Sequence, residues 1–394
     1  ADPNSGSFST YAGRAIGPWA GFTIGWLYWW FWVLIIPVEA IAGADILHAW
    51  YPDVPSWAFA FLIMIVLSCS NLISVKNFGK FEYWFALVKV VAIIGFLVVC
   101  LMGVSGVWPL AQTSGVENLW SNGGFMPNGF GAVLAGVLVT IFSFFGAEIV
   151  TIAADETANP KDKIRRATNL VVYRIAIFYL ASIFLVVSLV AWNDPGLKAV
   201  GSFQRVLEVL NVPGAKLLVD LVVLVAVTSC MNSGLYTASR MLYSLGARGQ
   251  ALSMTKRISG AGVPTVAVIF STLAGFAGCL VNYVFPGKVF GFLLSTTGAI
   301  ALLVYLVIAV SQLRMRARAE REGTPLELKM WLFPWLTWLV IVVISLVLGY
   351  MLFSPDYRYE TLMTAAVTAL ILGIAFYRKR ARIEHQPQAM TDQG

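Results

Sequence analysis

Charged residues are scarce in this sequence, and their scarcity excludes a soluble globular protein. Only 12% of the 394 residues are charged, 59% are hydrophobic, and the mean hydropathy is +0.78. A soluble domain carries about 25% charged residues. The apolar runs are roughly 20 residues long, as in a membrane-spanning helix, and not the alternating segments of about 10 residues that build a barrel. The composition therefore predicts a helical integral membrane protein.

Residues that build metal sites, disulfides and catalytic clusters are also few. The two histidines, His48 and His385, are far apart, and no HExxH or CxxC pattern is present, so we expect neither a metal nor a cofactor. All four cysteines fall in apolar runs, which indicates no disulfide framework. No catalytic cluster is visible near a membrane face, and we do not expect an enzyme. The net charge of +7 does not indicate a nucleic-acid partner, because the basic residues lie between apolar runs.

Ten apolar runs predict ten transmembrane helices. The segments between them are too short for a soluble domain, so we expect one membrane domain over residues 1–382 and a polar cytoplasmic tail over 383–394. The first 18 residues have no basic segment before an apolar core and do not form a signal peptide. They resemble an internal loop, and we expect the chain to be a fragment. The runs cover residues 19–47, 57–75, 82–105, 130–153, 169–192, 214–239, 264–286, 289–313, 331–353 and 359–377.

The basic residues are distributed unevenly between the two sides of this predicted bundle. When successive loops are placed on alternate sides, 20 of the 27 Lys and Arg residues lie on the side of the N-terminus and five lie on the other side. The remaining two, Lys89 and Arg174, lie inside runs. Loops rich in Lys and Arg stay in the cytoplasm. The asymmetry supports ten spans and predicts that both termini are cytoplasmic.

The stretch FSFFGAEIVTIAADE, residues 142–156, interrupts the fourth run. Gly146 is a poor residue for a helix interior, and Glu148 costs about 2.5–3.5 kcal/mol in a bilayer unless it faces a cavity or a partner. One interpretation is a broken helix that lines a polar site. The other is a close helix contact at Gly146, with Glu148 paired to a neighbour. We favour the first.

Two further charged residues lie inside runs, and each has two interpretations. Glu39 follows Pro37, which kinks the helix and frees a carbonyl. Glu39 either pairs with a cation on another helix or is a cavity carboxylate that meets an amine. Lys89 lies seven residues into its run, about 10 Å deep. It either snorkels back to the surface or is a desolvated amine that carries a proton.

The segment SCMNSGLYTASR, residues 229–240, places a polar stripe in the sixth run. It includes Cys230 and Asn232, and the four-residue spacing of Asn232 and Tyr236 puts these two on one helix face. Polar stripes are often simple packing contacts between helices. A transport pathway is favoured when several spans each carry such an interruption, as they do here.

Long stretches of the chain match a known family. They include SGSFSTYAGRAIGPWAGFTIGWLYWWFWVLIIPVEA, NLISVKNFGKFEYWFALVKVVAI, FSFFGAEIVTIAADETANPKDKIRRATN and VTSCMNSGLYTASRMLYSLGARG. These stretches resemble bacterial amino acid permeases of the amino acid–polyamine–organocation (APC) superfamily, and within it the GABA (4-aminobutyrate) permease subgroup. Arg165 stands where relatives for other amino acids usually have proline, which agrees with that subgroup.

The resemblance implies a LeuT-like fold of twelve helices, with two inverted five-helix repeats and two extra helices. The ten runs would be helices 3–12, and the first two helices, including the first broken one, would be missing. Residues 19–105 would then be the remainder of the first repeat, 130–313 the second repeat and 331–377 the extra helices.

The resemblance also implies roles for single residues. Carbonyls at the break in helix 6 bind the substrate amine, Phe142 is an aromatic wall or gate, Glu148 acts in gating, and Lys89 acts in proton coupling. Glu39 and Cys230 are pocket residues on two other helices. The expected substrate-binding set is Phe142, Ser143, Phe144, Phe145, Gly146, Glu39, Cys230 and Asn232.

The resulting hypothesis is a secondary active transporter. It imports GABA or a similar small zwitterionic amino acid with protons across the bacterial inner membrane by alternating access. Its partners are the amino acid, protons and the lipid bilayer. Two alternatives stay open: a permease for another amino acid, such as proline or an aromatic one, and a membrane protein that binds an amino acid without transporting it.

Overall fold

The fold is built from long helices. The computed structural model describes residues 7–73, 75–141, 144, 146, 170–171, 173–285, 289–323, 330, 332–355 and 357–384, and these contain helices but no strand. Eight of the described helices are long and apolar enough to cross a membrane. They are α2 (Pro18–Trp50), α3 (Ser56–Ile73), α4 (Val75–Val104), α12 (Ala215–Ala247), α13 (Thr265–Val284), α14 (Val289–Arg321), α15 (Trp335–Phe353) and α16 (Arg358–Glu384).

These helices correspond to eight of the ten predicted runs, and the all-α membrane fold class is confirmed. The other two runs lie partly outside the described residues. Their described parts are α6 (Gly129–Ile141), the π-helix η3 (Ile175–Ala181) and α9 (Ser182–Leu189). Helices α14 and α16 continue beyond their apolar runs into charged sequence. A helix bonds its own backbone and does not have to end at the membrane surface, so hydropathy locates the span rather than the whole helix.

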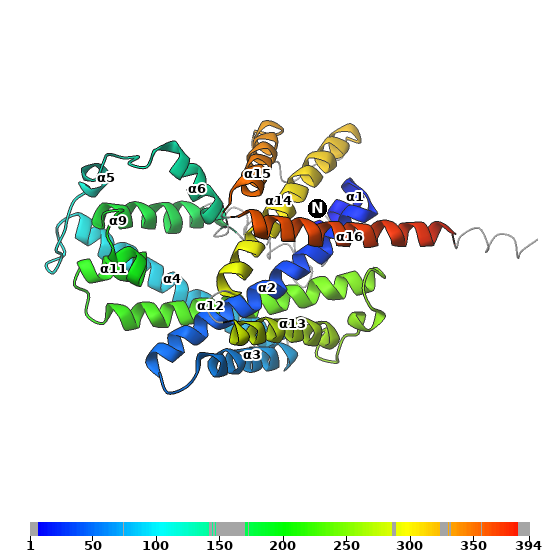
Figure 1. The fold of residues 1–394 in the computed structure, drawn as a ribbon, viewed down its shortest axis with the longest axis horizontal. Coiled ribbons are helices and arrows are strands. Elements are labelled where there is room, and N and C mark those ends of the chain that lie inside the picture. Colours follow the sequence, from blue (N-terminus) through cyan, green and yellow to red (C-terminus); the bar gives the residue numbers. More distant parts are fainter. Residues whose placement is uncertain are drawn as a thin grey trace, which may run out of the picture.

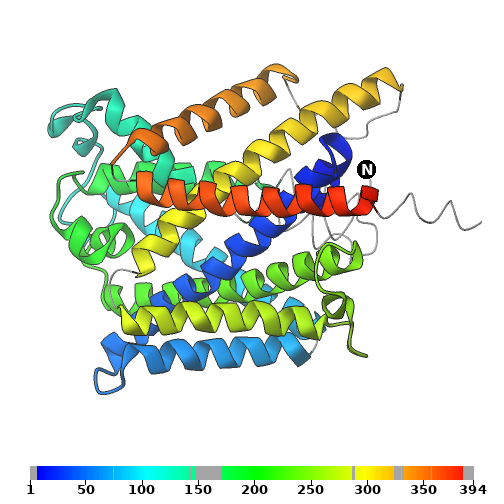
Figure 2. The ribbon, with the colours of Figure 1, turned by 45° about the vertical axis from the view of Figure 1, so that its right-hand side comes forward.

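Helix α2 is the centre of the bundle. It runs obliquely through the molecule and packs against α1 (Ser7–Ala15), α3, α12, α13, α14 and α16 (Figures 1 and 2). In the most apolar part of α2, 67% of the residues are buried inside the protein, compared with 11% in α4. Both helices are apolar, so the difference reflects position: α2 is covered by other helices, and α4 has a broad face that no other described residue covers.

Small residues let the neighbouring helices approach α2 closely. A Cβ added to Gly278 of α13 would lie 2.6 Å from Cγ of Pro37, and one added to Gly234 of α12 would lie 2.9 Å from Cε3 of Trp32. Lipid tails are as apolar as a protein core, so membrane helices associate through close packing of this kind. Pro37 of α2 is therefore in close contact with the backbone of α13.

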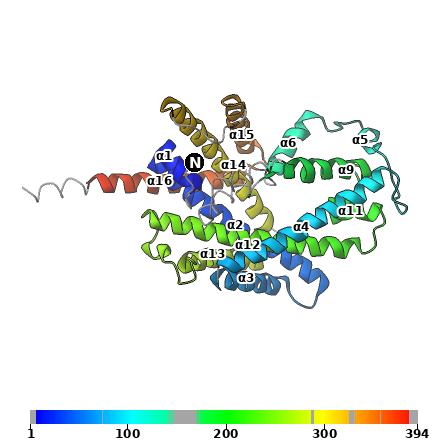
Figure 3. The ribbon, with the colours of Figure 1, turned by 180° about the vertical axis from the view of Figure 1, so that it is seen from behind.

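A second group of helices lies beside the far end of α4. Seen from behind, α4 passes along α12 toward α9 and α11 (Figure 3). Arg205 donates hydrogen bonds to Asp194 before α10, and these bonds hold the pKa of the Asp194 carboxyl below its usual range. The ion pair fixes the connection from α9 to α12. The short helices outside the spans are α5 (Asn118–Ser121), α10 (Gly196–Val200), α11 (Ser202–Val209) and the 3₁₀-helix η4 (Ser253–Lys256).

Replacing Gly278 by alanine is expected to destabilise the protein by about 1–3 kcal/mol, as overpacking does. The added methyl would meet the rigid ring of Pro37 at 2.6 and 2.8 Å. Gly373 of α16 is a matched control because no heavy atom lies within 4 Å of a Cβ built there. Its replacement by alanine is expected to be neutral or to stabilise by up to about 1 kcal/mol. Thermal unfolding in detergent measures both, and equal melting temperatures for the two variants would contradict the proposed contact.

Candidate functional site

Five polar side chains from three helices interact near Pro37 of α2. They are Glu39 of α2, Glu82 and Lys89 of α4, and Ser229 and Cys230 of α12. The Cys230 thiol donates a hydrogen bond to the Glu39 carboxylate, and Glu39 also interacts electrostatically with Lys89. The structure thus brings together three residues predicted from the sequence, Glu39, Lys89 and Cys230.

The Lys89 ammonium is bound inside the bundle. Lys89 Nζ donates a hydrogen bond to Ser229 Oγ at 2.7 Å, and Ser229 Oγ donates one to Glu82 Oε1 at 2.6 Å. The distance from Lys89 Nζ to Glu82 Oε1 is 3.8 Å. Ser229 is fully buried on α12, so Lys89 is directed toward α12 and does not snorkel to the surface.

The helical period of α4 explains why Glu82 and Lys89 share a partner. Residues seven apart lie on the same face, two turns from each other. Glu82, Phe85 and Lys89 are half-buried, whereas Tyr83 and Trp84 are exposed. This face packs against α12, so Glu82 and Lys89 point toward that helix, whereas Tyr83 and Trp84 are exposed on another face of α4.

A second polar contact lies one turn farther along α12. Asn71 of α3 donates a hydrogen bond from Nδ2 to Oδ1 of Asn232 at 2.8 Å, and both residues are buried. Within the part of the chain that the structure describes, Nδ2 of Asn232 and Oγ of Ser68 are buried without a hydrogen-bond partner. Asn232 therefore uses its carbonyl to hold α3 and keeps two amide hydrogens for another acceptor.

The predicted helix break is only partly within the described residues. Phe142, Ser143, Phe145 and Glu148 lie outside them, so their predicted roles stay predictions.

Gly146 is described, and its φ of +103° departs from helical geometry, as the broken-helix interpretation requires. The carbonyl of Phe144 accepts a hydrogen bond from the Tyr305 hydroxyl of α14 at 3.3 Å, and the Phe144 ring lies tilted against the ring of Tyr179 of η3, with 5.5 Å between the ring centroids. A π-helix in this position is a feature that the sequence did not signal.

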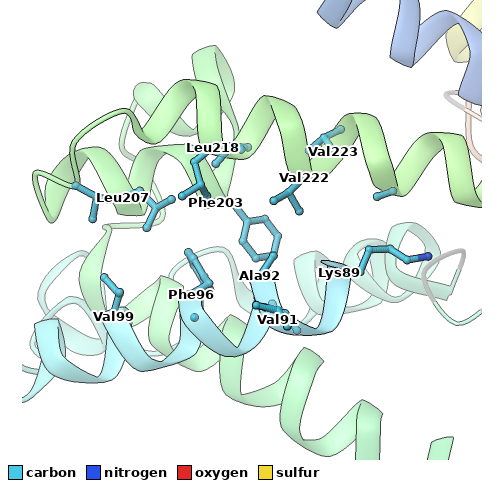
Figure 4. A pocket seen from close by; sticks show the side chains of 15 residues that line it. Lys89, Val91, Ala92, Phe96, Val99, Phe203, Leu207, Leu218, Val222 and Val223 are labelled. Atoms are coloured by element: carbon cyan, nitrogen blue, oxygen red, sulfur yellow. The ribbon is translucent and has the colours of Figure 1, made fainter. Parts of the chain in front are cut away.

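An apolar cavity of about 540 Å³ lies on the other side of Lys89, between α4, α11 and α12. In Figure 4, Lys89 stands at one end of it, and its ammonium points away from apolar side chains such as Phe96, Phe203 and Val222. Of the described residues that line the cavity, Lys89 is the one that is charged. Apolar walls do not compensate the charges of a zwitterion. The polar cluster, and not this cavity, is therefore the candidate site for a charged ligand.

Sequence reasoning missed Glu82, Ser229 and Asn71. Glu82 is the first residue of the predicted run 82–105, where a charge is expected at the membrane interface. The available signal was its seven-residue spacing from Lys89, which places both on one face. Ser229 and Asn71 gave no comparable signal, because a single small polar residue is common in membrane helices.

Comparison with known proteins gives consistent matches. The amino acid permease family matches residues 1–386. The chain is 59% identical over 374 residues to the gamma-aminobutyric acid permease of Escherichia coli, covering 95% of this chain and 80% of that protein. It is 56% identical over 386 residues to a probable GABA permease of Pseudomonas aeruginosa, covering 97% and 81%. The crystal structure of a manganese transporter from Eremococcus coleocola superposes with a TM-score of 0.55 at 12% identity, covering 95% of this chain and 84% of that one. At this identity the likeness concerns the fold alone.

The Asn71–Asn232 contact predicts that substitutions at the two positions are not additive. Asn71→Ala and Asn232→Ala each remove the same hydrogen bond, so the double variant should lose less than the sum of the single losses. Interhelical hydrogen bonds in membranes couple by about 0.6 kcal/mol on average and by up to about 1.7 kcal/mol. Unfolding free energies of the four proteins measure the coupling. Asn71→Ala combined with Thr368→Ala of α16, which shares no partner with it, is the additive control; an additive Asn71 and Asn232 pair would refute the contact.

Proposed function

The chain belongs to the amino acid permease family, and from this premise we propose that it imports GABA or a similar small zwitterionic amino acid. The two relatives described above, at 59% and 56% identity, bear the name GABA permease. One observation in the site carries the substrate class. Glu39 is a carboxylate inside the bundle whose hydrogen-bond partner is a thiol, and among the described residues it forms no ion pair.

A carboxylate inside the bundle without an ion-pair partner among the described residues favours a cationic ligand. Carboxylates inside membrane bundles pair with cations or face a polar cavity because hydrocarbon does not solvate them. The ammonium group of an amino acid supplies such a cation. Cys230, which contacts Glu39, and Asn232, with its unused amide hydrogens, lie on the same helix and are proposed to contact the substrate.

The helix break completes the proposed binding set. Backbone groups at an interrupted helix are free to bind a substrate, and the non-helical φ of Gly146 supports an interruption there. We assign Phe142, Ser143, Phe144, Phe145 and Gly146 to the substrate on this basis. The division into inverted repeats over 19–105 and 130–313 is part of the same proposal.

Proton coupling is proposed to involve Lys89 and Glu148. Lys89 interacts with both carboxylates of the cluster, so loss of its proton would change the charge that the substrate amine meets. Such a change biases which side of an alternating-access transporter is open. The proposed location is the bacterial inner membrane, and the distribution of Lys and Arg supports an orientation with both termini of this chain in the cytoplasm.

Uptake by the complete gene product in liposomes tests the function. Labelled GABA is expected to accumulate when an inward proton gradient is imposed, without sodium. Unlabelled GABA should compete better than proline or an aromatic amino acid. Accumulation that requires sodium and ignores the proton gradient would refute proton coupling. Stronger competition by proline or an aromatic amino acid would refute the substrate, and binding without flux would support the non-transporting alternative.

Lys89→Ala is expected to reduce gradient-driven accumulation to the level of protein-free liposomes, because the variant has no amine to exchange the coupled proton. Exchange of labelled for unlabelled GABA without a gradient should persist. Lys198→Ala is the matched control, since Lys198 is exposed on α10 and its loss should leave accumulation unchanged. Wild-type accumulation by Lys89→Ala would rule out the coupling role.

A further inference from the structure

We propose that Glu82 and Ser229 are positioning residues that hold the Lys89 ammonium away from Glu39, so that Glu39 stays available to the ammonium group of the substrate. The inference rests on the proposed function and assigns roles to two residues that the function itself does not require. The relevant observation is that the Lys89 ammonium interacts with two carboxylates, Glu82 and Glu39.

Lys89 interacts with two acidic residues but is bound to one of them. Its ion-pair partner among the described residues is Glu82, at 3.8 Å, whereas Glu39 attracts it through space without an ion pair. Attraction between unlike charges strengthens as they approach and as water is excluded. An ammonium released from Glu82 would therefore move toward Glu39, which is the other carboxylate that acts on it.

The Ser229 hydroxyl keeps the Lys89 ammonium next to Glu82 rather than next to Glu39. A hydroxyl has one hydrogen to donate and lone pairs to accept with. Here the hydrogen goes to Glu82 Oε1 at 2.6 Å, and a lone pair receives Lys89 Nζ at 2.7 Å. The three groups thus form one hydrogen-bonded arrangement, and its central member, Ser229, is fully buried.

Helix α12 separates the two carboxylates. Ser229 donates a hydrogen bond to Glu82, and the next residue, Cys230, donates one to Glu39. Consecutive residues on a helix point in different directions and do not face each other. Glu82 and Glu39 are therefore held on different sides of the same turn of α12. Lys89 pairs with Glu82, whereas Glu39 has the Cys230 thiol as its hydrogen-bond partner.

Among the described residues, the titratable groups on other helices that interact electrostatically with Lys89 are Glu39 of α2 and Cys230 of α12. A thiol neutralises a carboxylate poorly, so removal of Glu82 leaves Glu39 as the acceptor for Lys89. The amine of the substrate would then compete with an internal amine for one carboxylate. The expected signature is weaker substrate binding with transport capacity retained.

The test measures Kd for labelled GABA, and KM and maximal rate of gradient-driven uptake, for the complete gene product. Glu82→Gln and Ser229→Ala are each expected to raise Kd and KM by about tenfold, which corresponds to about 1.4 kcal/mol, with the maximal rate within about twofold. Glu82→Asp should recover part of the affinity. Glu208→Gln is the matched control, because it also breaks a half-exposed ion pair, with Arg205 at 3.6 Å, and should change neither constant.

A double variant separates positioning from a structural role. When Lys89 is absent there is no internal amine to compete, so Glu82→Gln combined with Lys89→Ala should bind GABA as tightly as Lys89→Ala alone. A tenfold weaker Kd that persists in the double variant would overturn the proposal, as would an unchanged KM in both Glu82→Gln and Ser229→Ala. Failure of the proposed function itself would look different: the wild-type protein would neither bind nor transport any of a panel of amino acids.

Discussion

Hydrocarbon satisfies no hydrogen-bonding group, and this constraint governs the whole structure. It requires each spanning segment to be a helix that bonds its own backbone, and it requires each polar side chain to find a partner inside the bundle. In this chain those partners converge where α2, α4 and α12 meet. Glu39, Lys89 and Ser229 are there because lipid excludes them from most other positions, so the energetic cost of burying charge also concentrates the chemistry in one place.

The scaffold and the site share helix α2. Pro37 lies inside α2, two residues before Glu39, and Gly278 of α13 allows a neighbouring backbone to pack directly on its ring. Close packing of this kind resists small displacements because interiors are dense. The carboxylate of Glu39 is consequently carried by the most enclosed helix of the described bundle. Helix α4 is mostly exposed, and it contributes to the cluster only the residues on the face that packs against α12.

Hydropathy predicted the helices well because the bilayer imposes a length and a composition on each span. It also indicated Glu39, Lys89 and the interruption at Gly146, since each violates the pattern of an apolar run. Hydropathy does not predict which residues these side chains contact. Whether Ser229 meets Glu82 depends on how α12 is rotated against α4, and interhelical packing sets that rotation. Asn71 was missed for the same reason: its contact with Asn232 crosses 161 positions of sequence.

Charge balance connects the cluster to its proposed ligand. Glu39, Glu82 and Lys89 give the cluster one acidic group more than it has basic groups, and an unbalanced ionisable group is costly to bury. A zwitterion that places its ammonium at Glu39 removes that imbalance and carries its own carboxylate away from the cluster, by the length of its apolar chain. If Lys89 paired with Glu39 instead, the uncompensated charge would fall on Glu82, at the edge of the span and far less useful for recognition. The position of Lys89 therefore decides where the bundle needs a cation, and Ser229, through its single hydroxyl, decides the position of Lys89.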